Sequence, residues 1–344
     1  MNKVINNLNQ DMEAIKGKTI AIVYIFEGDN SSGFEHFFIW KSNVITKWMN
    51  AVQNLHCMPL ILDVRTFVDK AINNTLPNID YVLNLNSGTY NLSSMALVPS
   101  TCSSIGIPCI PCDSIGIITG ENKNLSNLIA NSIGLNVPYS LDTPSENGIY
   151  RPINLGNSLG VEKGIVKNIK FGIYQEFIQG YDLTTPIVYN PIKKSMQLLP
   201  TVIFIPDNND QNWFISEDAK HTRNGFQPKI IKLCNKLETK LLELADTLSI
   251  QTFCRVDTRL KCTNSQSIEK LLTLDVELED LYFIEINTMP TIRENNSFSF
   301  SYSSILPSDK FSQVTETMKQ VYNLVDLHSF LLVNSILSFI KSKY

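Results

Sequence analysis

The stretch Tyr282-Phe-Ile-Glu-Ile-Asn-Thr-Met-Pro290 contains two polar residues, Glu285 and Asn287, within a run of strand-forming residues. Because side chains alternate between the two faces of a β-strand, both polar groups project from the same face. Arg255 and Asp257 show the same spacing in the stretch 252–259. If the two strands pair, three oxygen-bearing side chains meet on one surface beside an arginine. Such a set suits Mg²⁺ together with nucleotide phosphates, although the solvated face of a plain hairpin would show the same alternation.

The composition is that of an ordinary globular enzyme. A chain of 344 residues exceeds the size at which one hydrophobic core stops growing, which predicts two or three domains. The net charge of −4 offers no electrostatic reason to expect nucleic acid or an anionic membrane as a partner. The N-terminal segment lacks the apolar core of a signal peptide, and no apolar run is long enough to span a bilayer. We therefore expect a cytoplasmic protein.

Seven cysteines are scattered through the chain, and this odd number predicts reduced thiols. The segment Cys109-Ile-Pro-Cys112 has the spacing of a redox or zinc motif, but no second Cys or His pair lies at ligand spacing. We interpret these two residues as small apolar filler after a strand.

Strands and helices alternate over the first 118 residues, which predicts a parallel-sheet layer. Ligands bind beyond the carboxyl ends of the strands in such sheets, and Asn86-Ser-Gly88 follows one of these strands. The expected strands are 18–26, 59–64 and 80–85, and the expected helices are 36–54, 66–73, 119–135, 229–248 and 330–340.

Two further segments have the character of a nucleotide site. In Arg151-Pro-Ile-Asn-Leu-Gly-Asn-Ser-Leu-Gly-Val161, two glycines flank small polar residues, so the backbone could fold around phosphate oxygens. A plain glycine-rich β-turn would show the same pattern. The apolar run 174–182 ends in Asp182, which could hold ribose hydroxyls while the backbone of the strand meets an adenine edge.

In their order along the chain, these segments resemble the ATP-grasp superfamily, and within it the D-alanine–D-alanine ligase-like branch. The resemblance covers most of the chain from about residue 80 onward. Glu121-Asn-Lys123 stands where the family has Met-Asp-Lys, and Ser216-Glu-Asp-Ala-Lys-His221 is similar to its mobile loop. The other matching segments are 104–113 at the end of the N-terminal domain, 151–161 for the lid, 175–178 for the adenine hinge, Asp182 for the ribose, and 255–257 and 285–290 for the metal-binding core.

The resemblance implies an α/β chain with α+β subdomains and the ATP-grasp fold. We expect an N-terminal Rossmann-like domain with a parallel sheet over residues 1–118 and a central lid over 119–198. A C-terminal catalytic domain with an antiparallel sheet is expected over 199–344, with the nucleotide between the last two parts.

The resemblance also implies a reaction, in which a carboxylate takes the γ-phosphate of ATP and an amine then attacks the acyl phosphate. Two Mg²⁺ ions, which Mn²⁺ could replace, would neutralise the phosphates. Their implied ligands are Asp257, Glu285 and Asn287, with Glu285 bridging both ions, and Arg255 would stabilise the tetrahedral oxyanion. Lys220 would reach the γ-phosphate. The residues implied to hold the nucleotide are Lys123, Arg151, Asn157, Ser158, Gln175, Glu176, Phe177, Ile178, Asp182 and Lys220.

Several positions depart from the family pattern. Arg151 replaces the lysine of the lid, and a forked guanidinium differs from a point charge. Gln175 replaces a glutamate beside the adenine, but an amide can still donate and accept hydrogen bonds. Thr291 replaces the glycine after Asn-Thr-x-Pro and restricts that turn. Arg259 continues the face of Arg255 and could also point into solvent.

The markers of the amino-acid substrate match the family least. Asn86-Ser-Gly88 replaces the His-Gly loop, and 33–36 is at best a remnant of the Ser-x-Glu segment. The candidate substrate contacts are Asn86, Ser87, His221, Thr291, Arg293, Asn296 and Ser297. We therefore expect a ligase that joins amino acids or a peptide-like metabolite with a specificity other than D-alanine–D-alanine. The alternatives are a genuine D-alanine–D-alanine ligase and a non-catalytic nucleotide-binding module, and a homodimer is left open.

Overall fold

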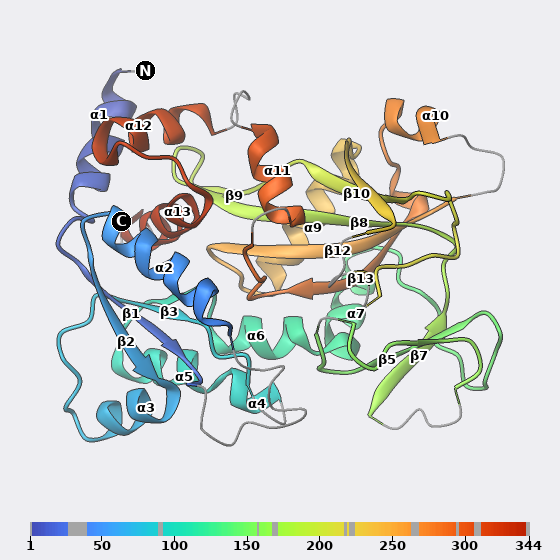
Figure 1. Cartoon of the computed structure of the whole chain (residues 1–344), viewed down its shortest axis with the longest axis horizontal. Coiled ribbons are helices and arrows are strands. Elements are labelled where there is room, and N and C mark those ends of the chain that lie inside the picture. The colour runs from blue at the N-terminus through green and yellow to red at the C-terminus, as the bar shows by residue number, and fades with distance from the viewer. Residues whose placement is uncertain are drawn as a thin grey trace.

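The computed structural model describes residues 2–26, 40–88, 92–156, 158–166, 171–216, 219, 224–262, 268–293, 296–305 and 311–341. Within these ranges, a parallel sheet with its helices lies at one end of the molecule and antiparallel sheets lie at the other (Figure 1).

The N-terminal sheet consists of parallel strands in the order β2-β1-β3-β4. Alternate residues of β1 reach opposite faces, with Ile20 and Ile22 on one side and Ala21 and Val23 on the other. Helices α2 and α13 cover the first face, and α3 and α5 cover the second. The strands are β1 (Thr19–Tyr24), β2 (Met58–Asp63), β3 (Tyr81–Asn84) and β4 (Cys109–Ile110). The helices are α1 (Asn2–Glu13), α2 (Ser42–Asn54), α3 (Val64–Ile72), α4 (Leu92–Met95), α5 (Leu97–Ile105), α12 (Ser312–Tyr322) and α13 (Leu327–Lys341).

Two helices and a small sheet follow this layer. The single helix predicted over 119–135 is wrong, because Asn122 adopts an extended conformation between α6 (Ser114–Glu121) and α7 (Lys123–Ser132). The side chain of Asn122 caps α7 by accepting hydrogen bonds from two backbone N–H groups. The small sheet has the order β6-β5-β7 and is called the lid sheet below. Its strands are β5 (Gly148–Pro152), β6 (Glu162–Lys163) and β7 (Gly172–Glu176).

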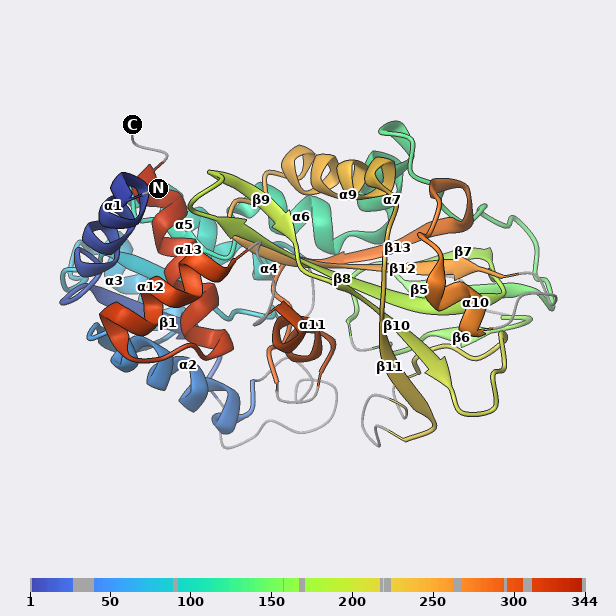
Figure 2. The same cartoon turned by 90° about the horizontal axis from the view of Figure 1, so that it is seen from above.

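The largest sheet has the order β11-β10-β8-β12-β13, and β9 pairs with β8. Helices α6, α7 and α9 cover one of its faces, and α11 lies on the other side of the sheet (Figure 2). The helix predicted over 229–248 begins only at Asn235, since residues up to Ile231 pair with β10 as a strand. The strands are β8 (Gly180–Asn190), β9 (Ser195–Leu198), β10 (Thr201–Pro206), β11 (Phe226–Ile231), β12 (Phe253–Lys261) and β13 (Leu281–Asn287). The remaining helices are α9 (Asn235–Thr247), α10 (Ile268–Thr273), α11 (Ser297–Ile305) and the 3₁₀ turn η2 (Leu278–Asp280).

The three domain ranges expected from the sequence stay a prediction. Strands β8 and β9 precede residue 199 yet belong to the largest sheet, and α13 returns from the C-terminal segment to pack on the N-terminal sheet. Burial raises the pKa of the Cys112 thiol well above its ordinary value, which fits its interpretation as apolar filler. Among the described helices, none is by itself long and apolar enough to cross a membrane. Only α12 and α13 taken together meet that test, and they are bent by 101° relative to each other.

Candidate functional site

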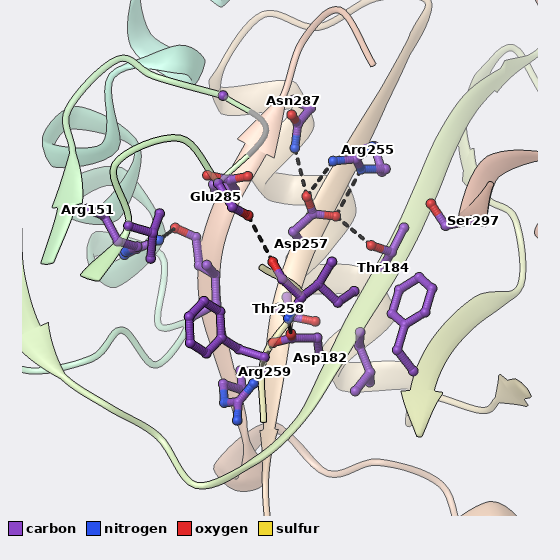
Figure 3. A pocket seen from close by; sticks show the side chains of 18 of the residues that line it. Arg151, Asp182, Thr184, Arg255, Asp257, Thr258, Arg259, Glu285, Asn287 and Ser297 are labelled. Carbon is purple, nitrogen blue, oxygen red and sulfur yellow. Dashed lines mark hydrogen bonds and ion pairs between the residues drawn. The ribbon is translucent and has the colours of Figure 1, made fainter. Parts of the chain in front are cut away.

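A cavity of about 920 Å³ lies between the lid sheet, the uncovered face of the largest sheet, α11 and the N-terminal layer. The predicted site residues that line it are Ser87, Lys123, Arg151, Ser158, Gln175, Glu176, Phe177, Ile178, Asp182, Arg255, Asp257, Glu285, Asn287, Thr291, Arg293, Asn296 and Ser297. Asn157, Lys220 and His221 lie outside the described residues. The fold therefore brings segments more than 200 residues apart to one cavity (Figure 3).

The strands β12 and β13 pair as the residue spacing predicted. They are antiparallel, with Arg255 opposite Asn287 and Asp257 opposite Glu285. The four side chains consequently share one face of the sheet, and this face lines the cavity. The register shifts between Asp257 and Thr258, just beyond the paired residues.

Asp257 is held by four hydrogen bonds from the protein. Its Oδ1 accepts from Thr184 Oγ1 at 2.6 Å and from Arg255 Nε at 2.9 Å. Its Oδ2 accepts from Arg255 Nη2 at 2.6 Å and from Asn287 Nδ2 at 2.8 Å (Figure 3). Burial disfavours the charge of Arg255, but the charge and hydrogen bonds of Asp257 outweigh burial and raise the pKa of the guanidinium. Arg255, expected at an oxyanion, therefore also orients a neighbouring carboxylate.

Lys123 connects Glu285 to the loop after β5. Its ammonium lies 3.4 Å from Glu285 Oε2 and donates a hydrogen bond of 2.7 Å to the carbonyl oxygen of Leu155. The lysine side chain is almost fully buried, whereas Glu285 is partly open to the cavity. An ammonium in this position could also meet a phosphate oxygen.

The face of β12 and β13 offers oxygen donors that fit a hard cation. Asp257 and Glu285 supply carboxylates, and the amide of Asn287 donates through its nitrogen to Asp257, which leaves its oxygen as an acceptor. Within the described ranges, no group of three His, Cys, Asp or Glu residues is arranged to hold a metal ion. The face thus suits Mg²⁺ only when further oxygen ligands, such as phosphates, complete the coordination.

Arg151 and Gln175, which both depart from the family pattern, are bonded to each other. Arg151 Nη2 donates to Gln175 Oε1 at 2.5 Å, and its Nη1 donates to the carbonyl oxygen of Ile284 at 2.7 Å. Burial lowers the pKa of Arg151 to about 10. Gln175 Nε2 donates in turn to the carbonyl oxygen of Pro138 at 3.0 Å. The guanidinium of Arg151 has two N–H groups to satisfy here, and the amide oxygen of Gln175 accepts from one of them. The two replacements, arginine for lysine and glutamine for glutamate, therefore complement each other.

The hinge after β7 presents an aromatic surface to the cavity. The ring of Phe177 lies under the ammonium of Lys163 at 3.7 Å and under the guanidinium of Arg259 at 4.6 Å. Phe214 packs edge-on against the same ring. Glu176 accepts a hydrogen bond from the backbone N–H of Tyr139. The apolar wall, which also includes Phe204 and Phe226, could receive a flat heterocycle.

Asp182 and Arg259 form a buried ion pair that the sequence did not indicate. Arg259 is 3% exposed, so the alternative that it points into solvent is wrong. Its Nη1 donates to Asp182 Oδ1 at 2.6 Å, and Asp182 Oδ2 accepts from the backbone N–H of Ile215 at 2.7 Å. Arg259 also donates to the carbonyl oxygens of Ile178, Gly180, Gln211 and Trp213. Asp182 thus lines the cavity with both carboxylate oxygens already engaged.

Glu121 is a site residue that sequence reasoning missed, although it belongs to the quoted segment Glu121-Asn-Lys123. Its Oε1 accepts hydrogen bonds of 2.7 Å from both the backbone N–H and the hydroxyl of Thr288. Burial raises the pKa of this carboxyl. A Cβ atom on Gly120 would lie 2.5 Å from Thr288 Cγ2, so α6 can approach β13 only with glycine there. Glu121 therefore fixes the turn that follows Asn287.

Some of the residues predicted to contact the amino-acid substrate form hydrogen bonds within their own loops. Asn86 does not line the cavity; its Nδ2 donates to the carbonyl oxygen of Ser94 at 2.5 Å, and its Oδ1 accepts from the N–H of Gly88. Asn296 Nδ2 donates to the carbonyl oxygen of Thr291 at 2.7 Å, and its Oδ1 accepts from the N–H of Ser299 in α11. Arg293 is exposed at the cavity rim.

No protein-family model matches this chain. Among curated proteins, it is 22% identical over 216 residues to the D-alanine–D-alanine ligase of Aquifex aeolicus (strain VF5), a match over 55% of this chain and 66% of that protein. Among solved structures, D-alanine–D-alanine ligase from Bacillus anthracis complexed with ATP superposes with a TM-score of 0.57 at 15% identity, over 90% of this chain and 99% of the other. This chain has the ATP-grasp fold. VanG D-Ala:D-Ser ligase from Enterococcus faecalis superposes with a TM-score of 0.55 at 16% identity, over 89% of this chain and all of the other.

The ATP-grasp fold is the one predicted from the ordered segments, and the relatives and solved structures named above are D-alanine–D-alanine or D-Ala:D-Ser ligases, in line with the suspected branch. The curated match spans just under two thirds of the length of its relative. The cavity lies between the lid sheet and the largest sheet, where the resemblance placed a nucleotide.

Proposed function

We propose that the protein is an ATP-dependent, ADP-forming ligase that joins the carboxylate of one amino-acid-like molecule to the amine of another. The observation that carries this proposal is the face of β12 and β13, which presents Asp257, Glu285 and Asn287 to a cavity beneath the lid sheet. The basic groups Lys123 and Arg151 line the same cavity beside this face, with Lys123 3.4 Å from Glu285 and Arg151 bonded to the carbonyl oxygen of Ile284 in β13. Together, these carboxylates and cations are of the kinds that position and neutralise a triphosphate.

The nucleotide would lie along the cavity from the hinge to the two strands. Phe177 and Ile178 would contact the adenine, with Glu176 at its edge, and Asp182 would lie near the ribose. Lys123, Arg151 and Ser158 would face the phosphates, and Asn157 and Lys220 are proposed to join them. Asp257, Glu285 and Asn287 would hold Mg²⁺, which neutralises phosphate charge when bound.

The proposed chemistry has two steps. A carboxylate oxygen of the first substrate attacks the γ-phosphorus of ATP, the bond to the β-phosphate oxygen breaks, and ADP leaves. The amine of the second substrate then attacks the acyl carbon, and inorganic phosphate departs with the bonding electrons. Arg255, anchored by Asp257, lies beside the place where negative charge develops on the acyl oxygen.

A specificity other than D-alanine–D-alanine is proposed because the substrate end departs from the family pattern. Asn86 is used inside its own loop, Thr291 replaces a glycine, and Arg293 brings a charge to the rim. Ser87, His221, Asn296 and Ser297 are the other proposed substrate contacts. A genuine D-alanine–D-alanine ligase is the second candidate, favoured by the name of the curated relative.

The decisive experiment is a screen for ADP release over pairs of amino acids of both chiralities, with mass-spectrometric detection of the products. Release that depends on two substrates, with a condensed product, supports the ligase. D-alanyl-D-alanine as the preferred product would favour the second candidate. If the protein binds ATP but releases no ADP with any pair of amino acids, the result would favour the alternative of a non-catalytic nucleotide-binding module.

ATP binding can be tested without any knowledge of the other substrates. In the presence of Mg²⁺, ATP at 100 times its dissociation constant should stabilise the protein by about 2.7 kcal/mol, because only the folded state binds it. Thermal unfolding with ATP, ADP and no nucleotide measures this effect. No response to either nucleotide would contradict the assignment of the whole cavity.

A further inference from the structure

The end of the cavity away from the hinge combines large apolar side chains with polar ones such as Ser87, Asn296 and Ser299. It is bounded by Trp40, which precedes α2, by Met95 at the end of α4, by Met289 after β13, and by Phe300 on α11. Figure 2 shows α11, which carries Phe300, between the N-terminal helices and the strands β10 and β11. The amide of Asn84 contacts the sulfur of Met289 at 3.4 Å, which joins that layer to the turn after β13.

These four side chains provide more apolar surface than the methyl side chain of an alanine substrate would cover. Two thioethers and two aromatic rings provide adaptable apolar surface, and such side chains make their contacts with bulky or flat groups. Phe300 is 36% exposed and Trp40 is partly exposed, so both rings keep surface that a bound molecule could cover. Covering such surface favours a ligand with an apolar side chain.

Trp40 also carries an unused hydrogen-bond donor. Its indole Nε1 is buried, and it has no hydrogen-bond partner in the part of the chain that the structure describes. A buried N–H without an acceptor costs free energy, and native structures rarely retain one. Trp40 packs against the core of the N-terminal layer and also lines the cavity.

We propose that Trp40 is a specificity-determining residue for an amino-acid substrate with an apolar side chain larger than a methyl group. The ring of Trp40 contacts that side chain, and its indole N–H donates to an oxygen of the same molecule. This inference rests on the proposed function, because it names the class of substrate for the same cavity.

The test measures binding and requires no turnover. The full-length protein is saturated with Mg²⁺ and a non-hydrolysable ATP analogue, and the binding of both enantiomers of alanine, methionine and phenylalanine is measured by calorimetry and saturation-transfer NMR. Methionine or phenylalanine should bind about tenfold more tightly than alanine, because even one added methylene in an apolar pocket has an effect of this size. Equal binding of all three, or binding of none, would overturn the proposal.

Two variants separate the ring from its N–H group. Trp40→Phe keeps an aromatic wall but removes the donor, and it should weaken binding of the preferred amino acid roughly three- to tenfold. Trp213→Phe is the matched control, because Trp213 packs on Phe226 near the hinge and is not part of the wall described above. Thermal unfolding checks that both variants fold. Unchanged binding by Trp40→Phe would overturn the role of the indole.

The proposed function and this inference can fail separately. Tight binding of methionine or phenylalanine without any ADP release would refute the ligase and leave the substrate class standing. Ligation of alanine alone, with no preference for larger side chains, would support the ligase and refute the role of Trp40.

Discussion

The two ends of the cavity are built in different ways. At the strand end, formed by β8, β12 and β13, the charged side chains are paired with one another: Asp257 accepts four hydrogen bonds, and Arg259 is locked to Asp182. At the loop end, formed by the segments 87–95 and 289–296 and by α11, polar groups come from loops, and the indole N–H of Trp40 has no partner among the described residues. Side chains on strands are held in fixed positions, whereas substitutions in loops can change substrate specificity without moving those side chains.

The strand end should depend on its ion pairs for stability. Arg259→Ala leaves Asp182 and several carbonyl oxygens without their donor, and it should lower the free energy of unfolding by about 3–5 kcal/mol. Guanidinium denaturation measures the loss. Lys261→Ala is the control, because Lys261 lies on the same strand but is exposed. Equal stability of the two variants would show that the pair does not anchor this end.

A substitution of Glu285, at the same end of the cavity, should affect the rate of ligation much more than the stability of the fold. Glu285→Gln keeps the shape but removes the charge, so it should lower kcat of ligation about 10²- to 10³-fold, the size found for lost transition-state electrostatics. Its thermal unfolding should fall only slightly, because residue 285 is partly open to the cavity, the glutamine oxygen can still accept from Lys123, and Lys123 keeps its hydrogen bond to Leu155. Glu279→Gln, on the exposed surface just before β13, is the control. Normal turnover in Glu285→Gln would remove the metal face from the proposal.

Glu121 tests the junction between the two ends. Glu121→Ala leaves the N–H and hydroxyl of Thr288 without an acceptor and should cost about 1–3 kcal/mol of stability. Glu121→Gln keeps an oxygen that can accept both bonds and avoids the buried charge, so its loss should be smaller. Chemical denaturation of both variants makes the comparison. Equal losses would mean that the charge, and not the acceptor, is what Thr288 needs.

Arg293 should have the smallest effect, because it belongs to the loop end. If it holds a carboxylate of the second substrate, Arg293→Ala should raise the KM for that substrate about tenfold, the value of one charge-assisted contact. ATP affinity and thermal stability should not change. Arg65→Ala, at an exposed position of α3, is the matched control. An unaltered KM would leave Arg293 on the surface and direct the search to Ser87 and Ser297.

The shared face of β12 and β13 that lines the cavity could be predicted because it depends on local geometry. Glu285 with Asn287, and Arg255 with Asp257, share faces through the period of two in a strand, and the order of the surrounding segments indicated the ATP-grasp fold. The two incorrect helices had a physical cause as well. The apolar spacing continued across Asn122 and across residues 229–231. However, Asn122 is extended and caps the start of α7, and residues 229–231 pair with β10 ahead of α9.

The sequence by itself determined which residues share a strand face, and it predicted which segments would hold phosphate and metal and where they depart from the pattern that they resemble. These properties follow from spacing within a single segment. Only the tertiary structure decided the partners: Arg259 with Asp182, Arg151 with Gln175, and Glu121 with Thr288. Each pair joins groups 24 to 167 positions apart, so no local pattern records it. The packing of whole sheets and helices brings these groups together, and burial then requires each charge to find its partner.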